Sequence, residues 1–262
     1  MRLPIYQIDA FASAVFKGNP AAVVPLEQWL PDATLQAVAL ENNLSETAFF
    51  VPEGDLWRLR WFTPAVEVDL CGHATLATAH LIFTRLAPGR DRVAFLTRSG
   101  RVEVARKGEL LELDFPAAAP QIRSDAMTLD ALEGALGCRP EEAYVASKYM
   151  AVFHSEEQVA ALKPDMARVV ALGGIGVIAT APGRACDFVS RFFAPAAGIP
   201  EDPVTGSAHT VLTPFWAKRL GKRQLQARQI SARGGELACE DRGERVGIAG
   251  RAVLYLEGTI TI

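Results

Sequence analysis

The sequence predicts an α+β fold of two pseudo-symmetric halves, each a curled mixed β-sheet wrapped around a central helix. Segments rich in aromatic and β-branched residues, separated by turn residues, indicate many short strands. A helix expected to begin at Gly72 carries no Asp, Glu, Lys or Arg before Arg85, so it should be buried on all sides. The motifs of the first half recur in the same order in the second half.

The first half is expected to contain four strands and one further helix ahead of the buried one. Alternating and aromatic-rich patterns place the strands at residues 5–11, 21–24, 46–51 and 56–62. The further helix should begin at Pro31-Asp32 and end near Asn43. These strands would supply the sheet that covers the buried helix.

Four short motifs recur at an offset that varies only from 131 residues (60 to 191) to 135 residues (106 to 241). The pairs are 31–32 with 164–165, 60–64 with 191–195, 71–74 with 205–208, and 106–109 with 241–244. We therefore expect an internal duplication with halves at 1–120 and 121–262, divided near the Ala/Pro-rich stretch 117–124, and strand 252–262 crossing back. The second copy of the buried helix contains Pro214 and should be kinked or short.

The composition excludes several classes of partner. The chain has 262 residues, 50% of them hydrophobic, and a scattered net charge of -3, which gives no basis for binding nucleic acid or an anionic membrane. Without a membrane-spanning run or a signal-peptide pattern, a cytoplasmic protein that acts on a small molecule is expected. The four cysteines form no CxxC pair and the histidines no HxxxH pair, so we expect reduced thiols and no metal site.

Five motifs in order resemble one family across nearly the whole chain. They are DAF at 9–11, GNPAA at 18–22, NLSETAF at 43–49, CGHAT at 71–75 and EDPVTGSA at 201–208. The chain is thereby similar to the PhzF-like family of phenazine biosynthesis, which has a diaminopimelate epimerase-like fold. The resemblance implies a cleft between two halves, no cofactor or metal, acid/base isomerase chemistry and a homodimer. It places the functional positions at Glu46, Gly72, His73, Asp202 and Ser207.

The residues support catalytic roles for Glu46, His73 and Asp202. Glu46 heads an apolar strand, where partial desolvation would let its carboxylate take and return a proton near neutral pH; an edge-strand glutamate facing solvent is the alternative. His73 follows the expected helix start at Gly72, whose positive end would keep the ring neutral; the alternative is a buried histidine bonded to a carbonyl. Asp202 precedes a proline, so it could equally be a turn or capping residue.

Three residues are expected to bind the substrate. Gly72 and Gly206 would let an anionic group, such as a carboxylate, approach two helix N-termini. Ser207 would present its hydroxyl and N–H to the same group, or simply cap its helix.

Two other functions remain open on the sequence. Cys71 at a helix N-terminus could act as a thiolate in an amino- or hydroxy-acid epimerase or racemase, together with Glu46 or Asp202. The repeat, however, places Thr205 opposite Cys71, and a two-thiol mechanism needs a second cysteine, so we interpret Cys71 as a packed residue that can line the pocket. The third hypothesis is a small-molecule binding protein without catalysis.

Overall fold

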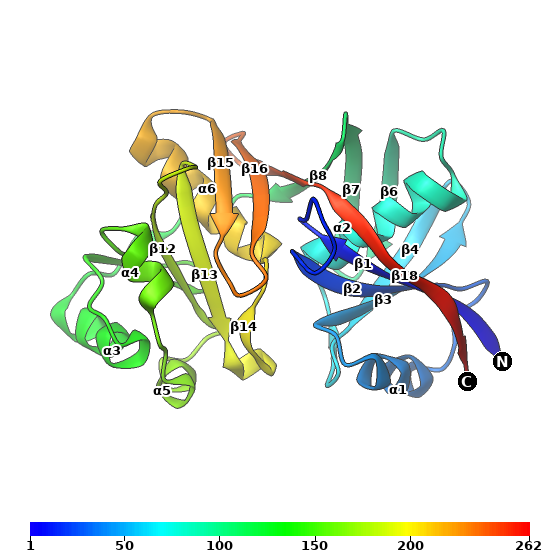
Figure 1. Cartoon of the computed structure of the whole chain (residues 1–262), viewed down its shortest axis with the longest axis horizontal. Helices are drawn as coiled ribbons and strands as arrows, with labels where there is room; N and C mark the ends of the chain where they lie inside the picture. The colour runs from blue at the N-terminus through cyan, green and yellow to red at the C-terminus, as the bar shows by residue number, and fades with distance from the viewer. The chain divides into compact units, whose positions relative to one another are not determined.

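The computed structural model describes all residues from 1 to 262, and the chain divides into two compact units. One comprises Met1–Asp114 and Ala249–Ile262, and the other comprises Phe115–Ile248 (Figure 1). Both units combine a mixed β-sheet with a few helices, which confirms the predicted α+β class. The last strand belongs to the first unit.

The first unit is built on strands that pair in both directions. The elements are β1 (Arg2–Ala10), β2 (Asn19–Pro25), α1 (Asp32–Asn42), β3 (Glu46–Glu53), β4 (Leu56–Phe62), β5 (Glu67–Val68), α2 (Gly72–Leu81) with its π-helical extension (Ile82–Leu86), β6 (Arg92–Thr97), β7 (Gly100–Lys107), β8 (Leu110–Pro116), in which the unit boundary falls, and β18 (Ala252–Thr261). The strands and helix expected up to β4 are therefore confirmed.

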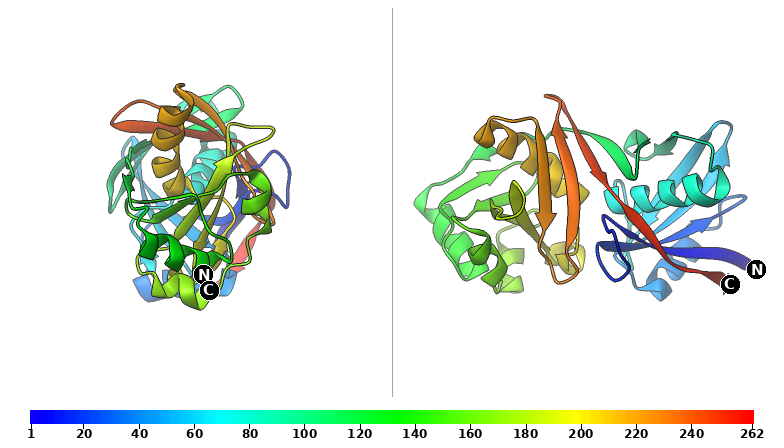
Figure 2. Two further views of the ribbon diagram at one scale, coloured as in Figure 1. Left: turned by 90° about the vertical axis from the view of Figure 1, so that its left-hand side faces the viewer. Right: turned by 45° about the horizontal axis from the view of Figure 1, so that its top comes forward.

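Strand β1 holds the two ends of the chain together. It pairs antiparallel with β2 and also with β18, so the N- and C-terminal strands lie side by side (Figures 1 and 2). Ile262 N donates to Met1 O at 2.8 Å, and the amino terminus of Met1 donates in return to Ile262 O. Strand β2 then runs parallel to β3, and β3 antiparallel to β4, so the sheet is mixed.

Both faces of this sheet are covered, which explains why β3 is buried from Thr47 to Val51 without interruption. Phe49 packs in a cluster with Leu35 and Val38 of α1, while the next residue, Phe50, points to the other face because side chains alternate along a strand. Helix α2 contacts β1, β2 and β3, and every residue of α2 except His80 is buried. As predicted, α2 is enclosed and has no solvent-facing side.

The second unit repeats the order of strand pairings. Its elements are β9 (Gln121–Ile122), α3 (Ala126–Leu136), β10 (Glu142–Val145), β11 (Tyr149–Val152), α4 (Glu156–Ala161), α5 (Met166–Ala171), β12 (Val177–Pro182), β13 (Phe188–Ala194), a 3-10 turn (Pro195–Ala197), β14 (Ile199–Asp202), α6 (Gly206–Leu220), β15 (Gln224–Gln229), β16 (Gly235–Asp241) and β17 (Arg245–Gly250). Strands β11 to β15 pair with the same directions as β2 to β6. An internal duplication remains our proposal for this match.

Helix α6 is the central helix of the second unit. The sequence predicts it to be kinked or short, and it is not short. It has 15 residues against the 10 of α2, with Pro214 inside it. Proline has no N–H to bond the carbonyl four residues earlier, which is that of Thr210. That carbonyl accepts instead from Ala118 N at 3.0 Å, so the group that Pro214 cannot bond keeps a partner.

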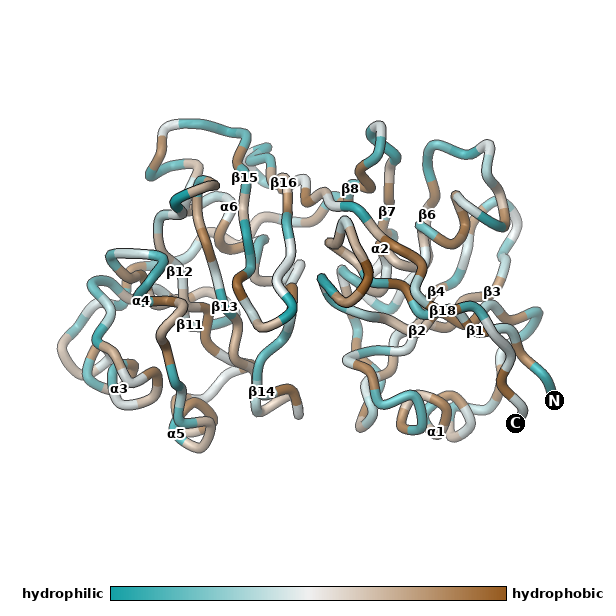
Figure 3. The backbone as a smooth tube through the Cα atoms, viewed as in Figure 1, coloured by the Kyte–Doolittle hydropathy of each residue, from teal (hydrophilic) through white to brown (hydrophobic).

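Aromatic contacts fix α6 to its sheet. Trp216 is 1% exposed, stacks on Phe188 of β13 and donates its indole N–H to Thr180 Oγ1 of β12 at 3.0 Å. The strands that receive α6 carry hydrophobic segments, drawn in brown along β12 and β13 in Figure 3. None of the helices in either unit combines the length and apolar character needed to cross a membrane.

We predict that buried His209 of α6 makes the stability of the protein fall in acid. Its Nδ1 donates to Thr205 O at 2.8 Å, and burial lowers its pKa to about 4. The unfolded chain binds a proton below pH ~6.5 while the folded chain does not, so stability should decline by roughly 3 kcal/mol as the pH falls from 6.5 to 4. Chemical denaturation across this range measures the slope.

His209→Asn retains a donor for Thr205 O and should flatten that slope relative to the parent. The matched control is His154→Asn, because His154 is an exposed histidine of the same unit. An unchanged slope in His209→Asn would show that the acid sensitivity has another source.

Candidate functional site

In the first unit, Glu46 and His73 meet although they lie 27 positions apart in the sequence. Glu46 is the first residue of β3 and His73 the second residue of α2. Glu46 Oε2 lies 3.1 Å from His73 Nε2, and the two side chains are only 13% and 5% exposed. A carboxylate and an imidazole at this distance, screened from water, can share or exchange a proton.

The first turn of α2 lacks a side-chain cap. Cys71 is the N-cap residue, with an extended backbone, and its side chain makes no capping hydrogen bond. Helices α3, α4 and α5 are all capped, by Asp125, Ser155 and Asp165. Thr75 N donates to Cys71 O at 3.2 Å, but the N–H groups of residues 72 to 74 precede the first bond within the helix. Because these residues are buried, their N–H groups need a partner, and an anion is the partner that a helix N-terminus favours.

Asn19 is a further residue of this site. It is fully buried at the start of β2, and its Nδ2 lies 3.2 Å from His73 Nδ1. The preceding Gly18 has φ +65°, and a Cβ there would lie 2.1 Å from Ala10 O, so only glycine allows the turn that delivers Asn19. The motif at 18–22 contributes to the family resemblance, but the sequence predicts no role for the amide of Asn19.

The charge state of His73 differs from the expectation. Burial acts to lower the pKa of its ring, but Cys71 and Glu46 act to raise it, and the net pKa lies well above the ordinary value. Burial and the Glu46 carboxylate raise the pKa of Cys71 to about 11, so its thiol is uncharged near neutral pH. The attraction on the ring therefore comes from Glu46, and it outweighs the helix N-terminus that we expected to keep the ring neutral.

In the second unit, Asp202 lies in a buried hydrogen-bond network. Thr205 Oγ1 donates to Asp202 Oδ2 at 2.5 Å, and Gln229 Nε2 donates to Asp202 O at 2.7 Å and to Thr205 Oγ1 at 3.1 Å. Thr205 N donates to Gln229 Oε1 at 2.8 Å. Asp202, Thr205 and Gln229 are 8%, 6% and 1% exposed, so this network fixes the approach to α6.

Gly206 and Ser207 open α6 directly after this network. Gly206 is buried and Ser207 half-buried, and α6, like α2, has no side-chain cap. The capping role considered for Ser207 is therefore not the one it plays. Within their own units, the sequence-predicted residues are gathered: Glu46 with Gly72 and His73, and Asp202 with Gly206 and Ser207. Sequence reasoning missed Gln229, for which the alternating strand pattern of β15 carried no signal.

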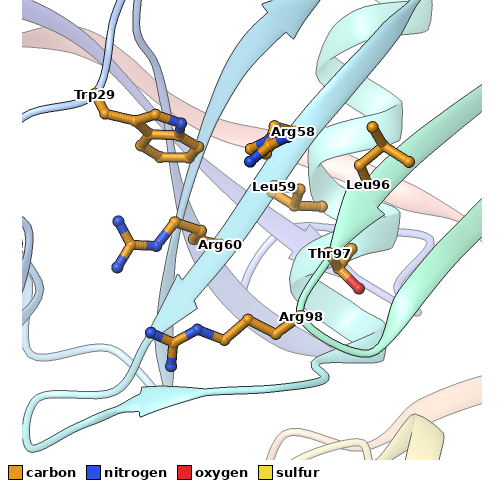
Figure 4. Close-up of a pocket in the computed structure, with 7 residues that line it drawn as sticks. All are labelled: Trp29, Arg58, Leu59, Arg60, Leu96, Thr97 and Arg98. Carbon is orange, nitrogen blue, oxygen red and sulfur yellow. The ribbon is translucent and has the colours of Figure 1, made fainter.

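A separate hollow of about 590 Å³ in the first unit is a weaker candidate site. Figure 4 shows Trp29 beside Arg60, with Arg58 and Arg98 on the same hollow. Three arginines suggest anion binding, but each guanidinium already pairs with a carboxylate: Arg58 with Glu53, Arg60 with Glu67 and Asp32, and Arg98 with Glu67. These pairs leave little positive charge for a ligand.

Several known proteins are similar to this chain in both sequence and fold. A model of the family described as phenazine biosynthesis-like protein matches residues 8–258. A relative from Pseudomonas aeruginosa named as an uncharacterized isomerase is 53% identical over 260 residues, 99% of each chain. A crystal structure of a phenazine biosynthesis protein of the PhzF family from Enterococcus faecalis is 49% identical, with a TM-score of 0.97 over 100% of each chain. A Pseudomonas aeruginosa structure described as a predicted epimerase shares the fold alone, at a TM-score of 0.79 and 19% identity over 99% of each chain.

We predict that Gln229→Leu destabilises the second unit by about 2–4 kcal/mol, because it removes the buried hydrogen bonds that Gln229 makes with the Thr205 N–H and the Asp202 carbonyl. Gln226→Leu on the same strand is the control, since residue 226 is exposed and its loss should change stability by less than about 0.5 kcal/mol. Urea unfolding measures both. Equal effects in the two variants would contradict a structural role for this network.

Proposed function

The chain belongs to the phenazine biosynthesis-like family and is an isomerase, and we propose that it works by cofactor-independent acid/base proton transfer on a small carboxylate-bearing substrate. The observation that supports this most is the buried contact of Glu46 Oε2 with His73 Nε2 at 3.1 Å, beside a helix start that no side chain caps.

In the proposed reaction Glu46 carries the proton. Its carboxylate takes a proton from one carbon of the substrate, and the electron pair of that C–H bond shifts into the adjacent conjugated system. The same carboxyl group then returns the proton to a second carbon, so that no atom or electron is gained or lost. His73 Nε2, 3.1 Å from Glu46 Oε2, would hold the carboxylate in place while it takes and returns the proton.

We propose that the substrate carboxylate binds at uncapped N–H groups. The first turn of α2, beginning at Gly72, offers such groups, and the start of α6 at Gly206 and Ser207 offers a second set. Asp202 is proposed to share the acid/base work through its carboxyl group, whose orientation is held by Thr205. The homodimer and the absence of nucleic-acid and membrane partners also remain predictions.

An epimerase that uses Cys71 as a base is the rival function. Its thiol is buried and, with a pKa of about 11, is protonated at neutral pH, whereas a base must be ionised. The corresponding N-cap of α6 is Thr205, which cannot supply a second thiol. Both observations favour Glu46 as the proton carrier.

We predict that Glu46→Gln lowers turnover by about 10²–10⁴-fold with little loss of ligand binding, because the amide keeps the size of the side chain but cannot accept a proton from carbon. A panel of small carboxylates, screened by thermal shift, identifies ligands. Incubation with each ligand in deuterated water, followed by mass spectrometry, then reports hydrogen exchange at carbon.

Glu53→Gln is the matched control, since Glu53 is an exposed glutamate at the other end of the same strand. It should exchange as the parent does. Full activity in Glu46→Gln would refute the proposed role. A parent protein that binds a ligand but neither converts it to an isomer nor exchanges its carbon-bound hydrogen would indicate a binding protein.

We predict that Cys71→Ser keeps at least about a tenth of the parent kcat, because an uncharged thiol takes no part in the proton transfer. Cys239→Ser, at another buried free cysteine, is the control for packing effects. Loss of activity confined to Cys71→Ser, together with tolerance of Glu46→Gln, would establish the epimerase instead.

A further inference from the structure

Three side chains with metal-binding atoms converge in the first unit. The carboxylate of Glu46, the thiol of Cys71 and the imidazole of His73 each offer one ligand atom, and these atoms all lie within 4.8 Å of one another. His73 Nε2 is 3.1 Å from Glu46 Oε2 and 4.0 Å from Cys71 Sγ. Cys71 and His73 are buried, and Glu46 is nearly so, so the cluster is not a chance grouping of surface charges.

The separations are close to those of a tetrahedral zinc site. Ligand atoms bound to one zinc ion at about 2.0–2.3 Å lie roughly 3.3–3.8 Å from each other. Glu46, Cys71 and His73 would therefore reach a common ion through small side-chain rotations. Three protein ligands leave a fourth position open for water or a ligand carboxylate.

We propose that Glu46, Cys71 and His73 form a binding site for a thiophilic divalent cation of the zinc type. A thiolate and an imidazole select zinc or cobalt over magnesium or calcium, which prefer oxygen ligands. On binding, the thiol proton and any proton on His73 Nε2 leave to solvent, and sulfur, nitrogen and oxygen donate electron pairs to the ion without a change of oxidation state.

The cation would act as an inhibitor. A carboxylate that is coordinated to zinc has given its electron pair to the ion and cannot accept a proton from carbon. This consequence rests on the proposed function of Glu46, whereas the binding of the cation does not. The spacing of residues in the sequence could not reveal this site, since Glu46 lies 25 positions before Cys71 and neither belongs to a recognised ligand motif.

Cobalt is the probe that tests the site without any substrate. Adding Co²⁺ to the metal-free protein should produce a sulfur-to-cobalt charge-transfer band in the near ultraviolet that saturates at one equivalent, and Zn²⁺ should displace it. Cys71→Ser should abolish the band, and Glu46→Gln should weaken Co²⁺ binding at least about tenfold. Cys239→Ser, at a buried cysteine outside the cluster, should leave the band unchanged.

The outcomes separate this proposal from the proposed function. If the parent protein shows no charge-transfer band, the proposed site is wrong, and this result does not depend on whether any variant folds. The site is also wrong if the band persists in Cys71→Ser or disappears only in Cys239→Ser. A cobalt band in a protein that neither isomerises any small carboxylate nor exchanges its carbon-bound hydrogen would leave the metal site standing while the isomerase mechanism fails. Hydrogen exchange that zinc does not slow would overturn the inhibitory role alone.

Discussion

The burial of α2 is the constraint on which the first unit depends. Every residue of α2 but one is buried, so strands must shield the helix from water on several sides. Strands β1, β2 and β3 contact it in this way. The start of α2 is thereby fixed next to Glu46, the first residue of β3. His73 is held against Glu46 by this packing and not by a flexible loop, which is the rigidity that acid/base chemistry requires.

The same burial leaves the first N–H groups of α2 in need of a hydrogen-bond acceptor. The three helices that the chain caps with Asp or Ser show that capping residues are available to it. At α2 and α6 the N-cap positions hold Cys71 and Thr205, and neither side chain caps its helix. Leaving buried N–H groups without a cap costs stability. A bound anion would offset that cost, which explains why binding and catalysis are proposed at the same place.

Much of the fold could be predicted from the sequence, because its signals are local. Strand alternation, the uncharged helix from Gly72 and the repeated motifs all reflect short-range patterns, and the elements up to β4 formed where they were expected. The length of α6 could not be predicted, since the carbonyl of Thr210 that Pro214 cannot bond is satisfied by Ala118, which is distant in sequence. The positions of Glu46 and His73 were predicted, but the raised pKa of His73 depends on a 3.1 Å contact that no spacing rule gives.

The central claim is that one carboxyl group, that of Glu46, moves a proton between two carbons. The most direct measurement follows a substrate that carries deuterium at the carbon from which the proton is taken, once the ligand screen has identified that substrate. In ordinary water, product analysis by NMR should show that the label leaves this carbon in every turnover, with a primary isotope effect on the rate. Product that forms while the deuterium stays at its original carbon would contradict proton transfer by Glu46.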